Sequence, residues 1–264
     1  MPPINFTLNE NALISKLLYQ PLFNVLILLY AYIPGNDMGL AIIALTLIIR
    51  AILYPSYLNM LKSQRALKEI QPQIDHIREL HKTDQTKQSQ GLMQVYKDNK
   101  ISPFSSCLPM ILQLIILWAL YRVFAFGLTP DSLSFVYDWL PHAPTTINNI
   151  FLAWTGVSWL TVDLAQPNIY LAVIAGLSQL WQGWYMKKFQ AIPKEGGGMM
   201  KLLTTQMIYL FPVITVFIAM SLPSALALYW IATTVFTVFQ QYVAMRSPST
   251  VPQRIIEHHE EPRN

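Results

Sequence analysis

The chain has 264 residues, of which 53% are hydrophobic and only 12% are charged, and its mean hydropathy is +0.35. Because soluble domains carry about 25% charged residues, this composition excludes an ordinary soluble domain. The net charge of +4 is modest, and the Lys and Arg residues are spread over loops, so we expect no direct nucleic-acid binding. The single cysteine, Cys107, excludes an intramolecular disulfide and a thiolate metal site.

Residues 1–37 are predicted to form an N-terminal segment outside the membrane. They lack the basic start and cleavage site of a signal peptide and also lack an Arg-rich transit segment, so we expect an uncleaved bacterial protein. Residues 13–33 are apolar but contain Pro21, which would interrupt a spanning helix. We therefore predict a helix that lies on the outer membrane interface, and a sixth span is the alternative.

Five apolar stretches follow, and each suffices to cross a bilayer core of about 30 Å, which takes roughly 20 helical residues. They are residues 38–58, 104–126, 168–186, 202–220 and 225–244. The predicted fold class is therefore an all-α membrane protein with five transmembrane helices, an outer interfacial helix and a cytoplasmic helical hairpin. The five-span core covers residues 38–244, and residues 245–264 form a short tail.

The distribution of basic residues predicts the orientation in the membrane. Short loops that are rich in Lys and Arg stay on the cytoplasmic side. Residues 59–103, the loop between the third and fourth spans, and the tail carry such residues, whereas residues 127–167 carry none. We therefore predict a multi-pass protein of the bacterial inner membrane with its N-terminus outside and its C-terminus in the cytoplasm. The loop 127–167 is rich in aromatic residues, which favours a position along the outer interface.

The cytoplasmic segment 59–103 has a helical pattern of apolar residues. Leu67, Ile70, Ile74 and Ile77 recur at spacings of three and four, and a second apolar set follows after a polar turn. This pattern predicts an antiparallel helical hairpin. Pro72 is expected in the first turn of a helix, where its missing N–H costs least.

Arg50 lies inside the first predicted span. A guanidinium at that depth costs roughly 2.5–3.5 kcal/mol on insertion scales, and no Asp or Glu occurs in the five predicted spans to pair with it. An unpaired arginine indicates a hydrated cavity, which we place on the cytoplasmic side because Arg50 is in that half of its span. The alternative is that the side chain reaches the phosphates of the inner interface.

Several polar residues in the spans are candidates for the same cavity. Thr46 lies one helical turn before Arg50 and so shares its face. The further candidates are Gln113, Gln179, Trp230, Thr233 and Thr234. For each of them the alternative role is a contact between neighbouring helices, which is common for polar residues in spans.

Five motifs in series resemble the YidC/Oxa membrane insertase family over nearly the whole chain. They are Thr46-x-x-x-Arg50-x-x-x-Tyr-Pro55, Cys107-Leu-Pro109-x-x-x-Gln113, Trp159-Leu-x-x-Asp163-Leu, Phe211-Pro212, and Leu222-Pro-Ser-Ala-Leu-Ala-Leu-Tyr229-Trp230 with Gln240-Gln241. The chain looks like a compact form without the large outer domain of some relatives. The resemblance is carried by the order and the spacing of the motifs together.

The resemblance implies a membrane protein insertase and chaperone with a hydrophilic groove that opens to the cytoplasm. Arg50 would lie on the groove wall, with Thr46, Gln113 and Trp230 on neighbouring walls. The implied partners are nascent membrane proteins and the lipid bilayer, and a Sec-type translocon and the ribosome are further candidates. The arginines of the tail are balanced by glutamates, so we expect no ribosome docking through the tail.

No enzymatic activity, cofactor or metal is expected, because the sequence contains no P-loop, no paired catalytic carboxylates and no nucleophile with its base. Two other functions stay open. The first is a small secondary transporter in which Arg50 binds an anionic solute, although the chain shows no repeated halves and no carboxylate in its spans. The second is a non-catalytic assembly scaffold, which should tolerate the loss of Arg50.

Overall fold

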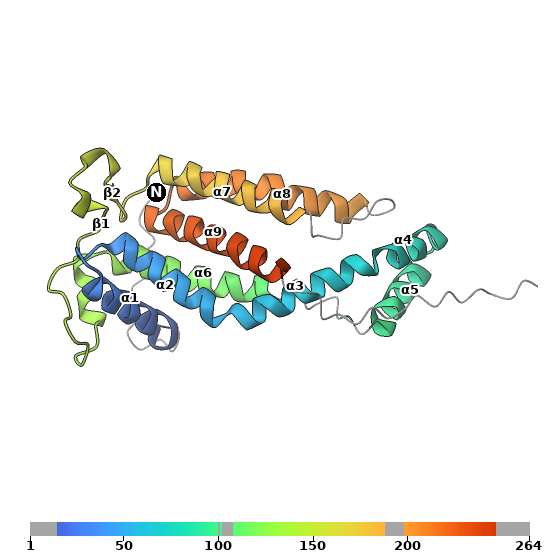
Figure 1. Ribbon diagram of the computed structural model, residues 1–264, viewed down its shortest axis with the longest axis horizontal. Helices are drawn as coiled ribbons and strands as arrows, with labels where there is room; N and C mark the ends of the chain where they lie inside the picture. Colours follow the sequence, from blue (N-terminus) through green and yellow to red (C-terminus); the bar gives the residue numbers. More distant parts are fainter. Residues whose placement is uncertain (1–14, 100, 102–107, 188–197, 247–264) are drawn as a thin grey trace, which may run out of the picture.

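The protein is an elongated, mostly helical bundle, shown as a computed structural model in Figure 1, and the structure describes residues 15–99, 101, 108–187 and 198–246. The principal helices are α1 (Gln20–Tyr32), α2 (Met38–Ile52), α3 (Tyr54–Glu69), α4 (Gln71–Leu80), α5 (Gln85–Asp98), α6 (Leu108–Gly127), α7 (Ile169–Lys187), α8 (Gly198–Ala219) and α9 (Ser224–Arg246). The shorter elements are η1 (Ser15–Tyr19), η3 (Pro130–Phe135), β1 (Ile150–Phe151), η4 (Ala153–Thr155), η5 (Ser158–Leu160) and β2 (Val162–Asp163). The first 14 residues, Cys107 and the tail beyond residue 246 lie outside the described residues.

The prediction of a mostly helical protein is confirmed. The second to fifth predicted spans coincide with α6, α7, α8 and α9 to within a few residues at each described end. Judged by length and apolar composition, none of the helices in the described ranges qualifies alone as a membrane span, while the bent pair α2 and α3 qualifies together. The count of five spans therefore stays a prediction.

The first predicted span, residues 38–58, is built from two helices. α2 ends at Ile52 and α3 begins at Tyr54, and the two helices are bent by 60°. Pro55 stands in the first turn of α3, where a proline is tolerated, but its ring cannot continue a straight helix from α2. Because α3 continues to Glu69, the bent helix pair α2 and α3 connects the predicted span to the hairpin.

Pro21 has a different effect from the one expected. It does interrupt the apolar segment, but it does so by starting α1, since it stands in the first turn after the π-helical η1. A proline at that position removes an N–H that has no partner within the helix in any case. α1 then packs along α2, and its residues Phe23, Ile27 and Tyr30 are all buried. Whether α1 lies on the membrane or spans it stays a prediction.

The predicted helical hairpin is confirmed as α4 and α5, which project from one end of the bundle (Figure 1). Pro72 stands in the first turn of α4 as expected. The two helices approach closely at Gly91, where an added Cβ would lie 2.8 Å from Cγ2 of Ile77. The side chain of Asp84 caps α5 by accepting hydrogen bonds from the N–H groups of Thr86 and Lys87.

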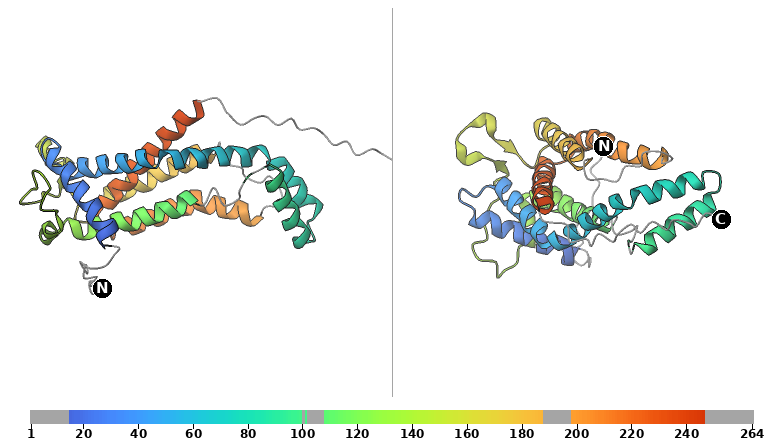
Figure 2. Two further views of the ribbon diagram at one scale, coloured as in Figure 1. Left: turned by 90° about the horizontal axis from the view of Figure 1, so that it is seen from below. Right: turned by 45° about the vertical axis from the view of Figure 1, so that its right-hand side comes forward.

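α9 lies at the centre of the bundle, between the pair α7 and α8 on one side and α2 and α6 on the other (Figure 2). The main hydrophobic core is formed by α1, α2, α6 and the first half of α9. α7 and α8 meet at Gly176, which is in contact with Val216 and the carbonyl oxygen of Pro212. This arrangement places both faces of α9 against other helices, and its polar residues become internal.

The loop at the other end of the bundle contains a short antiparallel pair, β1 and β2, which the sequence analysis did not predict. Asp37 ties this loop to the start of α2. Its buried carboxylate accepts hydrogen bonds from the N–H of Leu40 at 3.0 Å and from the N–H of Leu152 at 2.6 Å. Asn24 of α1 holds a second part of the loop by accepting from the N–H of Tyr137 at 2.7 Å.

Candidate functional site

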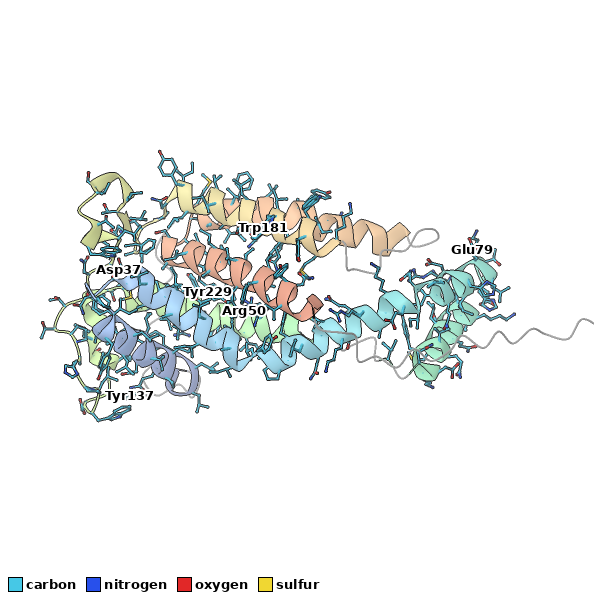
Figure 3. All side chains as sticks on the ribbon, viewed as in Figure 1. Asp37, Arg50, Glu79, Tyr137, Trp181 and Tyr229 are labelled. Atoms are coloured by element: carbon cyan, nitrogen blue, oxygen red, sulfur yellow. The ribbon has the colours of Figure 1, made fainter. Side chains whose placement is uncertain are left out.

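Arg50 lies in the last turn of α2, facing α9, just before the bend (Figure 3). Its guanidinium interacts electrostatically with the phenol groups of Tyr57 on α3 and Tyr229 on α9. It forms no ion pair with a carboxylate in the described part of the chain. A half-buried cation thus lies close to two neutral phenol groups, and the hydrated cavity expected around it stays a prediction.

Tyr229 joins Arg50 to the second helix of the site. Its ring is buried, and its hydroxyl oxygen accepts a hydrogen bond from Nε2 of Gln113 on α6 at 2.7 Å. These contacts therefore connect three helices at the same position along the bundle, namely α6 through Gln113, α9 through Tyr229 and α2 through Arg50. Of the predicted site residues, Gln113 is the one that the structure connects most directly to the surroundings of Arg50.

A row of polar residues continues from Tyr229 along α9. Thr233, Thr237, Gln240 and Gln241 follow at helical spacing, and all four are buried. Thr237 donates from Oγ1 to the carbonyl oxygen of Thr233 at 2.7 Å, and its own carbonyl oxygen accepts from the hydroxyl of Tyr57 at 3.4 Å. Gln240 donates from Nε2 to the carbonyl oxygen of Arg50 at 3.5 Å. The row therefore contacts α2 at Arg50 and α3 at Tyr57, close to the bend between these two helices.

Several atoms of this row have no hydrogen-bond partner among the described residues. They are Oε1 of Gln240 and both Oε1 and Nε2 of Gln241, a residue that is 0% exposed. Buried polar groups are normally paired, and an unpaired one costs roughly 1–3 kcal/mol. We refer to Arg50, Tyr57, Gln113, Tyr229, Thr233, Thr237, Gln240 and Gln241 as the polar cluster.

The remaining predicted residues are less closely connected with Arg50. Thr46 is buried, and its Oγ1 donates to the carbonyl oxygen of Ile42 in its own helix at 2.7 Å. Thr234 is buried one residue after Thr233 and so projects from another side of α9. Gln179 is on α7, and its buried Oε1 has no partner in the described ranges. Trp230 is half-buried and packs between the main core and the small cluster at α7 and α8.

The sequence analysis did not select Tyr57, Tyr229, Thr237, Gln240 and Gln241 as site residues. Three of them stand in the quoted motifs, and a signal for the row was present in the sequence. Positions 229, 233, 237 and 240 recur at intervals of three and four, which is the spacing of one helix face. Polar periodicity in the last span thus indicates Tyr229, Thr237 and Gln240, whereas Tyr57 belongs to the first span and shows no such signal.

Comparisons with known proteins place this arrangement in a family context. The family described as 60Kd inner membrane protein matches residues 28–251. The chain is similar to proteins named membrane protein insertase YidC. The one from Roseobacter denitrificans is 35% identical over 243 residues, which cover 89% of this chain and 38% of that protein. The one from Clostridium tetani is 37% identical over 199 residues, which cover 75% of this chain and 77% of that protein.

A third relative, from Jannaschia sp., is 34% identical over 239 residues and carries the same name. The matched residues cover 89% of this chain but 36% of that protein, so the chain spans well under half of the length of the first relatives it matches. The Clostridium tetani protein is a relative of comparable length. The matched region contains α2 to α9 and hence the whole polar cluster.

Proposed function

Because this chain belongs to the 60Kd inner membrane protein family, we propose that it is a membrane protein insertase and chaperone whose polar cluster receives hydrophilic segments of nascent membrane proteins. The observation that carries the proposal is the position of Arg50. It is a cation without a carboxylate partner in the described residues, next to the Gln113–Tyr229 hydrogen bond and to buried amides that lack partners. Such a site is suited to transient binding of a polar segment of a substrate protein, which we call the guest.

The first proposed step is entry of a hydrophilic segment from the cytoplasm into a groove that the five-span core encloses and the polar cluster lines. Arg50 attracts acidic side chains there, because charges interact more strongly in a region of reduced dielectric than in water. The unpaired side-chain amide groups of Gln240 and Gln241 form hydrogen bonds with the peptide groups of the entering segment. The apolar part of the bilayer that the hydrophilic segment must cross is thereby shortened.

The second proposed step is release of the guest's apolar helix into lipid. The outward faces of α6, α7 and α8 carry exposed large apolar residues, such as Leu114, Leu177 and Phe217. A guest helix can slide along these faces and leave sideways, driven by burial of its apolar surface at roughly 25 cal/mol per Å². No nucleotide or cofactor takes part in this scheme.

We place the protein in the bacterial inner membrane with five spans, formed by α2 with the start of α3, α6, α7, α8 and α9. The core is residues 38–244, with the hairpin of residues 59–103 in the cytoplasm and the loop of residues 127–167 outside. The positive residues of α3 to α5 and their absence from the loop support this orientation. α1 lies on the outer interface, and residues 245–264 are cytoplasmic. A Sec-type translocon and the ribosome are proposed as further partners.

The test is insertion of a short membrane protein with an acidic translocated tail into proteoliposomes that contain only this protein. Protease protection of the tail is compared for wild type, Arg50→Lys and Arg50→Ala, with Lys82→Ala as a control that removes an exposed positive charge from the hairpin. We expect protection with wild type, Arg50→Lys and the control, and a loss with Arg50→Ala. Protection no higher than in empty liposomes would refute the insertase, and saturable uptake of an anionic solute would then identify a transporter.

A further inference from the structure

Arg122 is a second basic residue inside a predicted span, and it is not among the predicted site residues. It stands in α6 five residues before Gly127, at the end of the helix that leads into the loop 127–167. Its Cζ lies 5.3 Å from the ring centroid of Trp118 and 5.9 Å from that of Phe126. The guanidinium is thus held between two aromatic side chains, which attract cations.

The charge of Arg122 is not compensated within the described part of the chain. It forms no ion pair there, and its buried Nε has no hydrogen-bond partner. Aromatic contacts contribute only about 0.5–2 kcal/mol and leave the N–H groups unsatisfied. An arginine at this end of a span also runs against the usual bias of basic residues toward the cytoplasmic side. The uncompensated charge indicates an anionic ligand, and the position against this bias agrees with it in the orientation proposed above.

Tyr19 supplies a second donor beside Arg122. The residue is 2% exposed, and its hydroxyl is buried without a partner among the described residues. Its ring is fixed by stacking on Phe23 and by an edge contact with Phe135. Burial raises the pKa of Tyr19 to about 12 even though the nearby charge of Arg122 acts in the opposite direction. The phenol therefore stays protonated and can donate a hydrogen bond.

The surface below Arg122 is apolar and faces outward. Ile111, Ile115, Trp118 and Arg122 recur on α6 at spacings of three and four, so they share one helix face. Trp118 is 43% exposed, and Ile111 and Ile115 are exposed as well. A ligand that approaches Arg122 on this face therefore has a charged group at one end and an apolar body along the helix. That is the chemistry of a phospholipid.

We infer that Arg122 and Tyr19 bind the phosphate of an anionic phospholipid in the leaflet next to the loop 127–167, with an acyl chain along Ile111, Ile115 and Trp118. Arginine binds phosphate through two parallel charge-assisted hydrogen bonds, and the Tyr19 hydroxyl adds a third. The assignment to the outer leaflet rests on the orientation proposed above. The existence of the site does not, because it follows from the contacts of α6 and η1.

Lipid binding to the purified full-length protein in detergent tests this inference. Thermal unfolding and native mass spectrometry are recorded with phosphatidylglycerol, phosphatidylcholine or inorganic phosphate. We expect phosphatidylglycerol to raise the unfolding temperature of wild type by several degrees and to bind about tenfold more weakly to Arg122→Gln. Tyr19→Phe, which keeps the packed ring, should weaken binding by a smaller factor, and Arg122→Lys should retain part of it.

Equal binding of phosphatidylglycerol to wild type, Arg122→Gln and Tyr19→Phe would overturn the site. Stabilisation by inorganic phosphate to the same extent would overturn the lipid assignment, since the apolar face would then contribute nothing. These measurements need no insertion activity. Insertion can therefore fail in proteoliposomes while lipid binding persists, and that result would count against the proposed function alone.

Discussion

Gln113 on α6 donates a hydrogen bond to the hydroxyl oxygen of Tyr229 on α9 across 2.7 Å, although the two residues are 116 positions apart. Tyr229 is buried and interacts with the charge of Arg50 on α2. One neutral hydrogen bond thus sets the spacing of α6 and α9 at the level of the arginine. The stability of the protein and the geometry of the polar cluster therefore both depend on the hydrogen bond between Gln113 and Tyr229.

Gln113→Leu and Tyr229→Phe should each lower the free energy of unfolding by about 1 kcal/mol, because each removes the hydrogen bond between the two side chains. The double variant should lose less than the sum, since the bond is lost only once. Denaturant unfolding in micelles measures this. Gln179→Leu is the control, because its buried Oε1 has no partner in the described ranges and little stability should be lost. If the loss in unfolding free energy of the double variant equalled the sum of the two single losses, Gln113 and Tyr229 would not interact.

Asp37→Ala should detach the loop 127–167 from α2. The carboxylate accepts hydrogen bonds from the N–H groups of Leu40 and Leu152, so its removal leaves two donors unpaired and should cost about 1–3 kcal/mol. We expect faster proteolysis of the loop when protease is added to the outer face of vesicles. Asp98→Ala, which removes an exposed carboxylate at the end of α5, should stay within about 0.5 kcal/mol of wild type. Unchanged proteolysis of Asp37→Ala would show that other contacts hold the loop.

Local patterns predicted much of the fold. The spacing of Ile70, Ile74 and Ile77 predicted the first helix of the hairpin because it depends only on neighbouring turns of a helix, whereas Leu67 lies in α3. Hydropathy located α6 to α9 for the same reason. Hydropathy did not predict the bend before Pro55. The mean hydropathy of a segment contains no information on backbone geometry, whereas a proline ring prevents a straight helix. The proline itself was visible in the sequence, so this error was avoidable.

The candidate site was predictable only in part. Arg50 stood out because an uncompensated charge in an apolar stretch is costly wherever the helices pack. Its neighbours depend on which faces of α2, α6 and α9 meet, and no local pattern fixes that. Thr46 shares the face of Arg50 yet satisfies its hydroxyl on Ile42, which periodicity does not distinguish from a free hydroxyl. The bond between Asp37 and Leu152 is likewise a product of tertiary packing.

Gly176→Ala should separate α7 from α8. An added Cβ would collide with Val216 and would lie 3.2 Å from the carbonyl oxygen of Pro212, so backbone would have to shift. We expect a loss of about 1–3 kcal/mol in unfolding free energy. Gly183→Ala on the same helix is the matched control. Its Cβ would lie 3.2 Å from Cγ2 of Ile208 and 3.7 Å from the Cα and Cβ of that residue, which is ordinary contact. The gain in helix propensity of about 0.5–1 kcal/mol should offset most of the cost of the 3.2 Å contact. Equal losses would contradict the close packing at Gly176.

The role of Arg50 should depend on the charge of the translocated segment. If the guanidinium attracts acidic side chains, Arg50→Ala should reduce insertion of a guest with an acidic tail by about tenfold, the effect of roughly 1.4 kcal/mol. A guest in which the acidic residues are replaced by glutamine should be affected much less. Insertion rates for both guests, measured by protease protection with wild type, Arg50→Lys and Arg50→Ala, give the comparison. Raising the salt concentration should leave most of the difference in place, because screening is weak for a half-buried charge. Equal losses for acidic and neutral guests would instead indicate that Arg50 acts by hydrating or shaping the polar cluster, since only an electrostatic attraction to the guest can discriminate between the two tails.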